Sequence, residues 1–156
     1  MNRWFIRFVC LAILLAFAVM TAQIAGLNGT WKLNVERSRW GKVQKPVSVV
    51  LQIQHAEPHL TYSGTVIYSN EDMRTFAFDG AIDGREYHMD RSYGSGSIVT
   101  RRLNSQAIKS VFHSEDGRFT ETATTTISAG GTVLTRQLQV DGPGGRRSWT
   151  EVYDKQ

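Results

Sequence analysis

The sequence predicts an all-β protein, an antiparallel up-and-down β-barrel of eight to ten short strands, preceded by an N-terminal signal peptide helix. Three observations predict it. Apolar and polar side chains alternate with a period of two along about ten short segments after residue 26. Glycine, aspartate and asparagine turns separate these segments at the even spacing of a sandwich or barrel. No stretch after residue 26 has the 3.6-residue period of a helix.

The first 25 residues have the composition of a targeting signal. Arg3 and Arg7 give a basic start, residues 8–20 form an unbroken apolar run, and small or polar residues follow. The run is shorter than the roughly 20 residues that span a bilayer comfortably. We therefore expect residues 1–25 to be a signal peptide and residues 26–156 to be a secreted or periplasmic domain with no membrane span. An uncleaved membrane anchor is the alternative, because the cleavage site is poorly defined.

Cysteine content and charge exclude several classes of protein. Cys10 is the only cysteine, so residues 26–156 can form neither an internal disulfide nor a cysteine metal site. The domain must therefore be held together by core packing. The whole chain has 18 lysines and arginines against 14 acidic residues, and two of those arginines belong to the signal. The remaining basic residues are dispersed, which argues against a nucleic-acid partner.

The expected strands follow one another as a series of hairpins. They occupy residues 30–35, 47–53, 60–68, 74–78, 86–89, 97–103, 107–113, 119–128, 132–140 and 148–155. Glycine-containing turns are expected at residues 79–80, 83–84, 115–118, 129–131 and 141–145. A meander of this kind leaves two open edges unless it closes on itself, so we expect the first and last strands to pair.

The two ends of this domain carry a family resemblance. Residues 29–33 (GTWKL) resemble the opening Gly-x-Trp of the lipocalins and their calycin relatives, and residues 151–155 (EVYDK) look like the closing strand of the same group. Residues 27–38 are similar to those of uncharacterised bacterial lipocalin-like proteins. The resemblance implies a lipocalin-like barrel with one open mouth, which in relatives often holds a small apolar molecule.

The resemblance also implies how the barrel closes. In lipocalins, a basic side chain from the late part of the chain packs on the tryptophan of the opening motif. Lys155 is the first candidate for that contact with Trp31, and Arg147 is the second. Such a cation–π contact is worth about 0.5–2 kcal/mol, depending on burial. Trp31 is accordingly expected to plug the barrel rather than to contact a ligand.

Charged residues are expected on the inward face of the last hairpin. Alternation places Arg136 with the apolar residues of its strand and Glu151 with Tyr153, so Arg136 and Glu151 should lie opposite each other, with Glu121 joining them. These residues could anchor the polar group of a ligand or form a structural ion pair, and a shift of one residue would turn them all outward. The fatty-acid-binding branch has Arg-x-Tyr where this chain has Glu151-x-Tyr153, which argues against simple fatty-acid capture.

The leading functional prediction is a non-catalytic, exported protein that binds a small apolar or amphipathic molecule. The candidate interior residues are Leu51, Ile53, Tyr62, Val66, Phe76, Phe78, Phe112, Leu134, Arg136, Glu151 and Tyr153. The alternative is a protein-interaction barrel, an inhibitor or assembly factor, with a filled core and no ligand. An enzyme is the third hypothesis, and it ranks last because no acid–base pair is evident. No cofactor is expected. His55, Glu57 and His59 lie around a turn, so no metal site is expected there.

Overall fold

The computed structural model describes residues 26–156, which form ten β-strands. The strands are β1 (Gly29–Leu33), β2 (Ser48–Ala56), β3 (His59–Ile67), β4 (Met73–Ala81), β5 (Glu86–Arg91), β6 (Gly96–Asn104), β7 (Ala107–Ser114), β8 (Thr120–Ile127), β9 (Val133–Asp141) and β10 (Arg147–Lys155). The predicted signal peptide lies outside these residues. The described part contains no helix that is long and apolar enough to cross a membrane.

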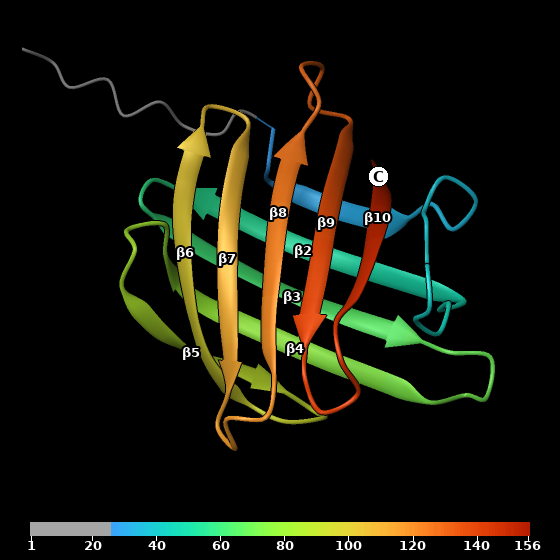
Figure 1. The fold of residues 1–156 in the computed structure, drawn as a ribbon. Helices are drawn as coiled ribbons and strands as arrows, with labels where there is room; N and C mark the ends of the chain where they lie inside the picture. The colour runs from blue at the N-terminus through green and yellow to red at the C-terminus, as the bar shows by residue number, and fades with distance from the viewer. Residues whose placement is uncertain (1–25) are drawn as a thin grey trace, which may run out of the picture.

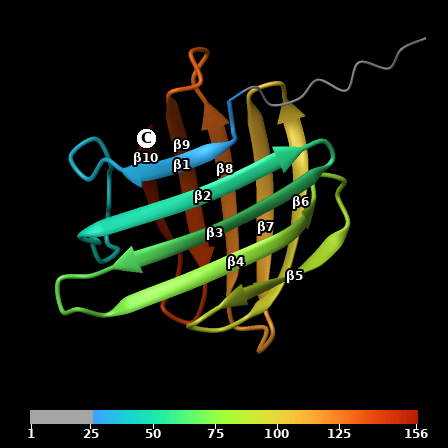
Figure 2. The same ribbon diagram turned by 180° about the vertical axis from the view of Figure 1, so that it is seen from behind.

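The ten strands close into one antiparallel barrel. Each strand from β2 to β10 pairs with its neighbours in sequence, and β1 lies between β2 and β10 (Figures 1 and 2). In the closing pair, Trp31 lies opposite Lys155 and Leu33 lies opposite Tyr153. The predicted fold class is confirmed, with ten strands at the upper end of the expected range.

The alternation of apolar and polar residues also determines which side chains of each strand point into the barrel. On β2, Val49, Leu51 and Ile53 are buried in the core, whereas Gln52 and Gln54 between them are exposed. This phase places every second side chain of each strand inside the barrel. Most of the buried hydrophobic residues of the described chain belong to one core cluster inside the barrel.

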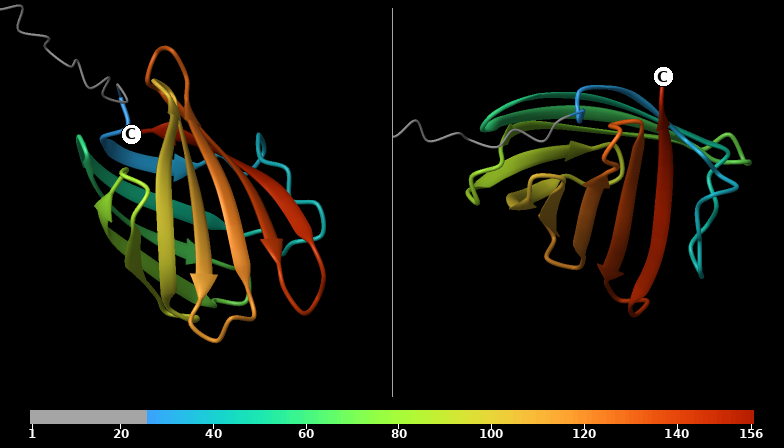
Figure 3. Two further views of the ribbon diagram at one scale, coloured as in Figure 1. Left: turned by 60° about the vertical axis from the view of Figure 1, so that its left-hand side comes forward. Right: turned by 90° about the horizontal axis from the view of Figure 1, so that it is seen from above.

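The barrel is flattened into two crossing layers with two distinct ends. Strands β6 to β10 form one layer, and the long strands β2 to β4 cross behind it at a steep angle (Figure 3). We call the end that contains the start of β1 and the turns β2–β3, β4–β5, β6–β7 and β8–β9 the closed end. The open end contains the turns β3–β4, β5–β6, β7–β8 and β9–β10 and the long connection from β1 to β2.

Several local expectations were wrong. Asp79 and Gly80 were expected to form a turn but lie inside β4, where a Cβ on Gly80 would come within 2.7 Å of the Phe78 and Tyr87 rings. Gly80 therefore allows the two rings to pack close to the backbone, and it does not form a bend. The expected strands 47–53 and 119–128 begin one residue later in the structure. Val47 and Phe119 therefore lie just before β2 and β8, and they are 59% and 37% exposed.

Candidate functional site

The closed end is built around Trp31. Its side chain is completely buried, and its Nε1 donates a hydrogen bond to the carbonyl oxygen of Leu27 at 3.0 Å. The Lys155 Nζ lies 5.2 Å from the centre of the Trp31 ring and donates to the Gly26 carbonyl oxygen at 2.9 Å. A Cβ on Gly29 would lie 2.8 Å from the Lys155 side chain, so the glycine of the opening motif makes room for this contact. Arg147, the second candidate, lies at the other end of the barrel.

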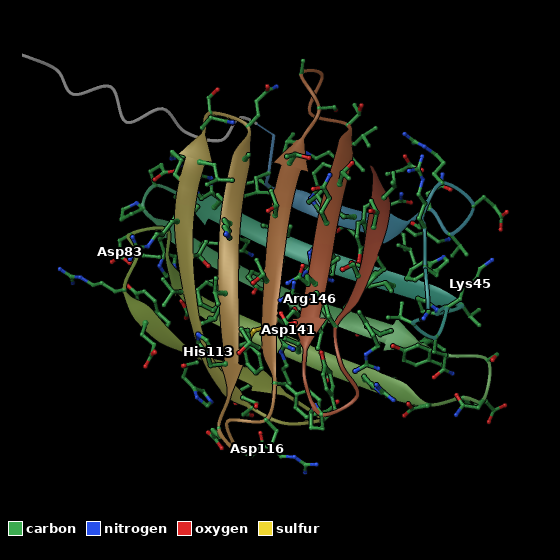
Figure 4. The ribbon with its side chains drawn as sticks, in the orientation of Figure 1. Lys45, Asp83, His113, Asp116, Asp141 and Arg146 are labelled. Carbon is green, nitrogen blue, oxygen red and sulfur yellow. The ribbon has the colours of Figure 1, made fainter. Side chains whose placement is uncertain are left out.

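The open end contains a cavity of about 1010 Å³, which we call the open cavity. Ligand sites in proteins usually measure about 300–1,000 Å³, so this volume is sufficient for a small molecule. Eight aromatic residues line it: Trp40, Tyr68, Phe76, Tyr93, Phe112, Phe119, Trp149 and Tyr153. Figure 4 shows Asp116, another lining residue, at the tip of the β7–β8 turn, and Lys45 in the β1–β2 connection beside the cavity-lining Gln44 and Pro46.

A second cavity lies deeper, towards the closed end, and has a volume of only about 50 Å³. It is lined mainly by apolar residues, and its volume leaves room for only a few water molecules. Six residues line both cavities and therefore lie between them: Phe76, Met89, Arg91, Phe112, Glu121 and Arg136. We call this set the partition. A ligand that enters the open cavity would stop at the partition.

One ion pair beside the partition joins β9 to β10. Arg136 and Glu151 lie opposite each other in the strand register, and the Arg136 Nη1 is 3.3 Å from the Glu151 Oε2. The buried carboxylate of Glu151 also accepts hydrogen bonds from the Trp149 Nε1 and the Tyr153 hydroxyl, both at 2.8 Å. Glu151 is therefore fully engaged by three donors. The hairpin argument places this pair correctly, and its role in ligand binding stays a prediction.

Burial and charge set the protonation of this group. Burial acts to lower the pKa of Arg136, but Glu151, Tyr153, Glu121 and Tyr62 together more than offset that effect, and the pKa lies above its ordinary value. Burial, followed by the charge of Glu151, raises the pKa of Tyr153 well above its ordinary value. Arg136 therefore carries a positive charge and Tyr153 keeps its proton, which it donates to Glu151.

A second ion pair crosses the barrel within the partition. The Nη1 and Nη2 atoms of Arg91 donate to the two carboxylate oxygens of Glu121, each at 3.1 Å. The Arg91 side chain is 6% exposed, and its guanidinium carbon lies 3.6 Å from the centre of the Phe112 ring. The sequence analysis missed Arg91 and assigned Glu121 to Arg136 instead. Alternation with the buried Met89 on β5 could have indicated that Arg91 points inward.

The other predicted interior residues divide between the two cavities. Leu51, Ile53, Tyr62 and Leu134 line the small cavity, Val66 and Tyr153 line the open cavity, and Phe76 and Phe112 line both. Phe78 lines neither. It is buried in the core, with its ring centre 5.1 Å from that of Tyr62 and 6.1 Å from that of Tyr87.

Five of the eight aromatic residues of the open cavity were not among the predicted interior residues: Trp40, Tyr68, Tyr93, Phe119 and Trp149. Trp40 lies in the β1–β2 connection and Tyr93 in the β5–β6 turn, where alternation gives no guidance. Trp149 is on β10 and shares the inward face of Glu151, so the sequence did contain a signal for it. Gly64, which lies opposite Phe76 on the neighbouring strand, leaves room for the Phe76 ring to reach the interior. A Cβ at position 64 would collide with that ring.

A buried polar cluster near the closed end involves His55. Its Nε2 lies 3.0 Å from the Glu57 Oε1, and Arg102 forms an ion pair with the same carboxylate. Burial, followed by the charge of Arg102, lowers the pKa of His55. His59 does not join them, because its Nε2 lies 3.3 Å from Asp79. Residues 26–156 contain no group of three histidine, cysteine or acidic side chains that could hold a metal ion.

Comparison with known proteins identifies the fold but not a family. No protein-family model matches the sequence, and no curated protein matches it. The structure of the zebrafish ileal bile acid-binding protein complexed with cholic acid is similar, with a TM-score of 0.56 and 17% identity, over 85% of this chain and 100% of that one. A redesigned β-barrel is also similar, with a TM-score of 0.54 and 11% identity, over 88% of this chain and 97% of that one. The fold is a closed ten-stranded antiparallel barrel similar to that of the bile acid-binding protein, whereas lipocalins close eight strands.

Proposed function

We propose that this chain is an exported, non-catalytic protein that binds a small apolar or amphipathic molecule in the open cavity. The observation that carries this proposal is a cavity of about 1010 Å³ that is lined by aromatic side chains and ends at a charged partition. Export rests on the composition of residues 1–25. A lipocalin-like origin rests on the opening and closing motifs of the domain.

The lining of the cavity supports binding of an amphipathic molecule. Aromatic walls supply a large apolar contact area, and a few well-placed polar groups fix orientation, which is the usual composition of small-molecule sites. A barrel of similar fold holds cholic acid, although at 17% identity that likeness concerns the fold. The alternative is a barrel that binds other proteins on its outside and has a filled core. The open cavity fits that alternative poorly, because a filled core would be packed solid.

The state of the inward carboxylates supports a non-catalytic role. Glu151 accepts three hydrogen bonds, and Glu121 accepts two from Arg91. Both carboxylates are therefore already engaged by donors of this chain, and a substrate would have to displace these partners to reach them.

The proposal is tested by titrating the purified protein with a polarity-sensitive fluorophore and by blocking the cavity. Val66→Trp adds bulk on the inward face of β3, where Val66 lines the open cavity. The matched control is Thr65→Trp, on the outward face of the same strand. We expect saturable binding by the parent protein and by the control, and a loss of at least about tenfold in affinity for Val66→Trp. Equal binding by all three proteins, or none by the parent, would contradict the proposal.

A further inference from the structure

The charges that line the open cavity are balanced. Three of its guanidinium groups are each paired with a carboxylate: Arg74 with Asp72 at 2.8 Å, Arg91 with Glu121, and Arg136 with Glu151. Of the remaining lining charges, Arg147 is basic, and Glu115 and Asp116 are acidic. The cavity is thus lined by five carboxylates and four guanidinium groups, and offers no excess of positive charge.

The hydrogen-bonding groups left over in the cavity are donors. Trp40 Nε1 and Arg91 Nε belong to lining residues and are buried without a hydrogen-bond partner in the described chain. Arg136 uses one of its five N–H donors on Glu151 and lines both cavities. Among the residues described, no buried side-chain oxygen lacks a partner. A complementary ligand must therefore supply acceptors.

From these two observations we infer that the open cavity selects uncharged amphipathic molecules that carry an acceptor group, such as an ester or amide carbonyl, over carboxylates. The inference rests on the proposed function and specifies its ligand class. The acceptor group would lie at the partition beside Arg136, and the apolar body would lie between the aromatic walls. The small cavity behind the partition leaves no room for a ligand chain to pass it.

The free-energy cost of desolvation explains the selection. An anion that enters the cavity loses its hydration and must find an unpaired cation, but each guanidinium group of the partition region is already neutralised. Displacing Glu151 would leave that buried carboxylate without its counter-charge, which is strongly unfavourable. A neutral carbonyl can accept a hydrogen bond from Arg136 while the ion pair to Glu151 stays intact.

The test uses two probes that have the same apolar chain but differ in charge and by one methyl group: laurate and its methyl ester. Each probe is titrated against the complex of the purified protein with the fluorophore, and displacement is measured at about pH 8, where the laurate carboxylate is ionised. We expect the ester to bind the parent protein at least about tenfold more tightly than laurate. Tighter binding of laurate would overturn this inference and leave the proposed function standing. Failure of both probes and of the fluorophore to bind would contradict the proposed function itself.

Glu151→Gln is the variant that isolates the charge. The glutamine oxygen can keep the hydrogen bond from Trp149 while its amide group donates to the Tyr153 hydroxyl, but the side chain no longer neutralises Arg136. The affinity for laurate relative to that for the ester should therefore rise by about tenfold. The matched control is Glu115→Gln, which removes the same charge at the cavity mouth without releasing an arginine and should change laurate affinity by less than about threefold. Equal gains in the two variants would contradict the role of Glu151. If Glu151→Gln does not fold, the inference is tested by the parent protein alone, which should bind the ester more tightly than laurate.

Discussion

The closed and open ends of the barrel are built from the same alternating strands but are filled differently. At the closed end, Trp31 is completely buried, Leu27 packs against the core, and only about 50 Å³ of space remains nearby. At the open end, aromatic and charged side chains surround about 1010 Å³. Sheet closure therefore requires tight packing at only one end, and the other end is free to carry a binding site.

The difference also concerns what each end contributes to stability. Burial of large apolar side chains at the closed end stabilises the fold directly. The ion pairs of Arg136 and Arg91 lie in a desolvated interior, where the loss of hydration offsets much or all of the gain from pairing. Charges kept inside at so little net gain are more simply explained by recognition of a ligand than by stability.

Removing the plug should give the largest effect on stability. Trp31→Ala leaves a cavity in the core and breaks the hydrogen bond to Leu27, so we expect a loss of about 3–5 kcal/mol in the free energy of unfolding. Urea denaturation measures it. Trp40→Ala at the open end is the matched comparison and should cost less than about 1.5 kcal/mol, because Trp40 is only partly buried in a connection. Equal losses would remove the distinction between the two ends.

Alkaline pH should destabilise the protein through its buried tyrosines. Burial raises the pKa of Tyr62 to about 12, and burial with the charge of Glu151 raises that of Tyr153 well above its ordinary value, whereas unfolded tyrosine ionises near pH 10.0. Above that pH the folded state binds more protons than the unfolded state, so the stability that is present below pH 10.0 is lost as the pH rises. Each residue should contribute a slope of about 1.4 kcal/mol per pH unit up to about pH 12.

Free energies of unfolding measured across this range, together with tyrosine absorbance, check this prediction. Tyr153→Phe should make the slope shallower, because one of the two buried hydroxyl groups is absent. A slope that is unchanged in this variant would show that Tyr153 already ionises in the folded protein at ordinary pH values.

The contact that closes the barrel should have the smallest effect. In Lys155→Met, the aliphatic part of the side chain still covers Trp31, but the charge over the ring and the hydrogen bond to Gly26 are lost. We expect a loss of about 0.5–1 kcal/mol, since the charged group is close to solvent. Thermal denaturation at matched ionic strength resolves a change of this size. A loss as large as that of Trp31→Ala would mean that Lys155 itself, and not the indole, holds the closed end.

The side-chain contacts that could be predicted from the sequence are those between strands that are neighbours in the sheet. The pair of Arg136 with Glu151 follows from alternation along two strands that are adjacent in the sheet. The contact of Trp31 with Lys155 was implied by the resemblance to lipocalins, and these two residues also lie on paired strands. The pairing of Arg91 with Glu121 joins β5 to β8 across the barrel interior, and these strands are not neighbours. Contacts of that kind depend on the curvature of the closed sheet. Trp40 was missed for a related reason, since a long connection has no periodicity.

The most direct test of the account follows the indole N–H signals of the tryptophans by NMR during titration with methyl laurate. Trp40 and Trp149 line the open cavity, and Trp31 plugs the opposite end. We expect saturable shifts of the Trp40 and Trp149 signals and no shift of the Trp31 signal. A shift of the Trp31 signal without changes at Trp40 and Trp149 would place the ligand at the wrong end of the barrel and contradict the account.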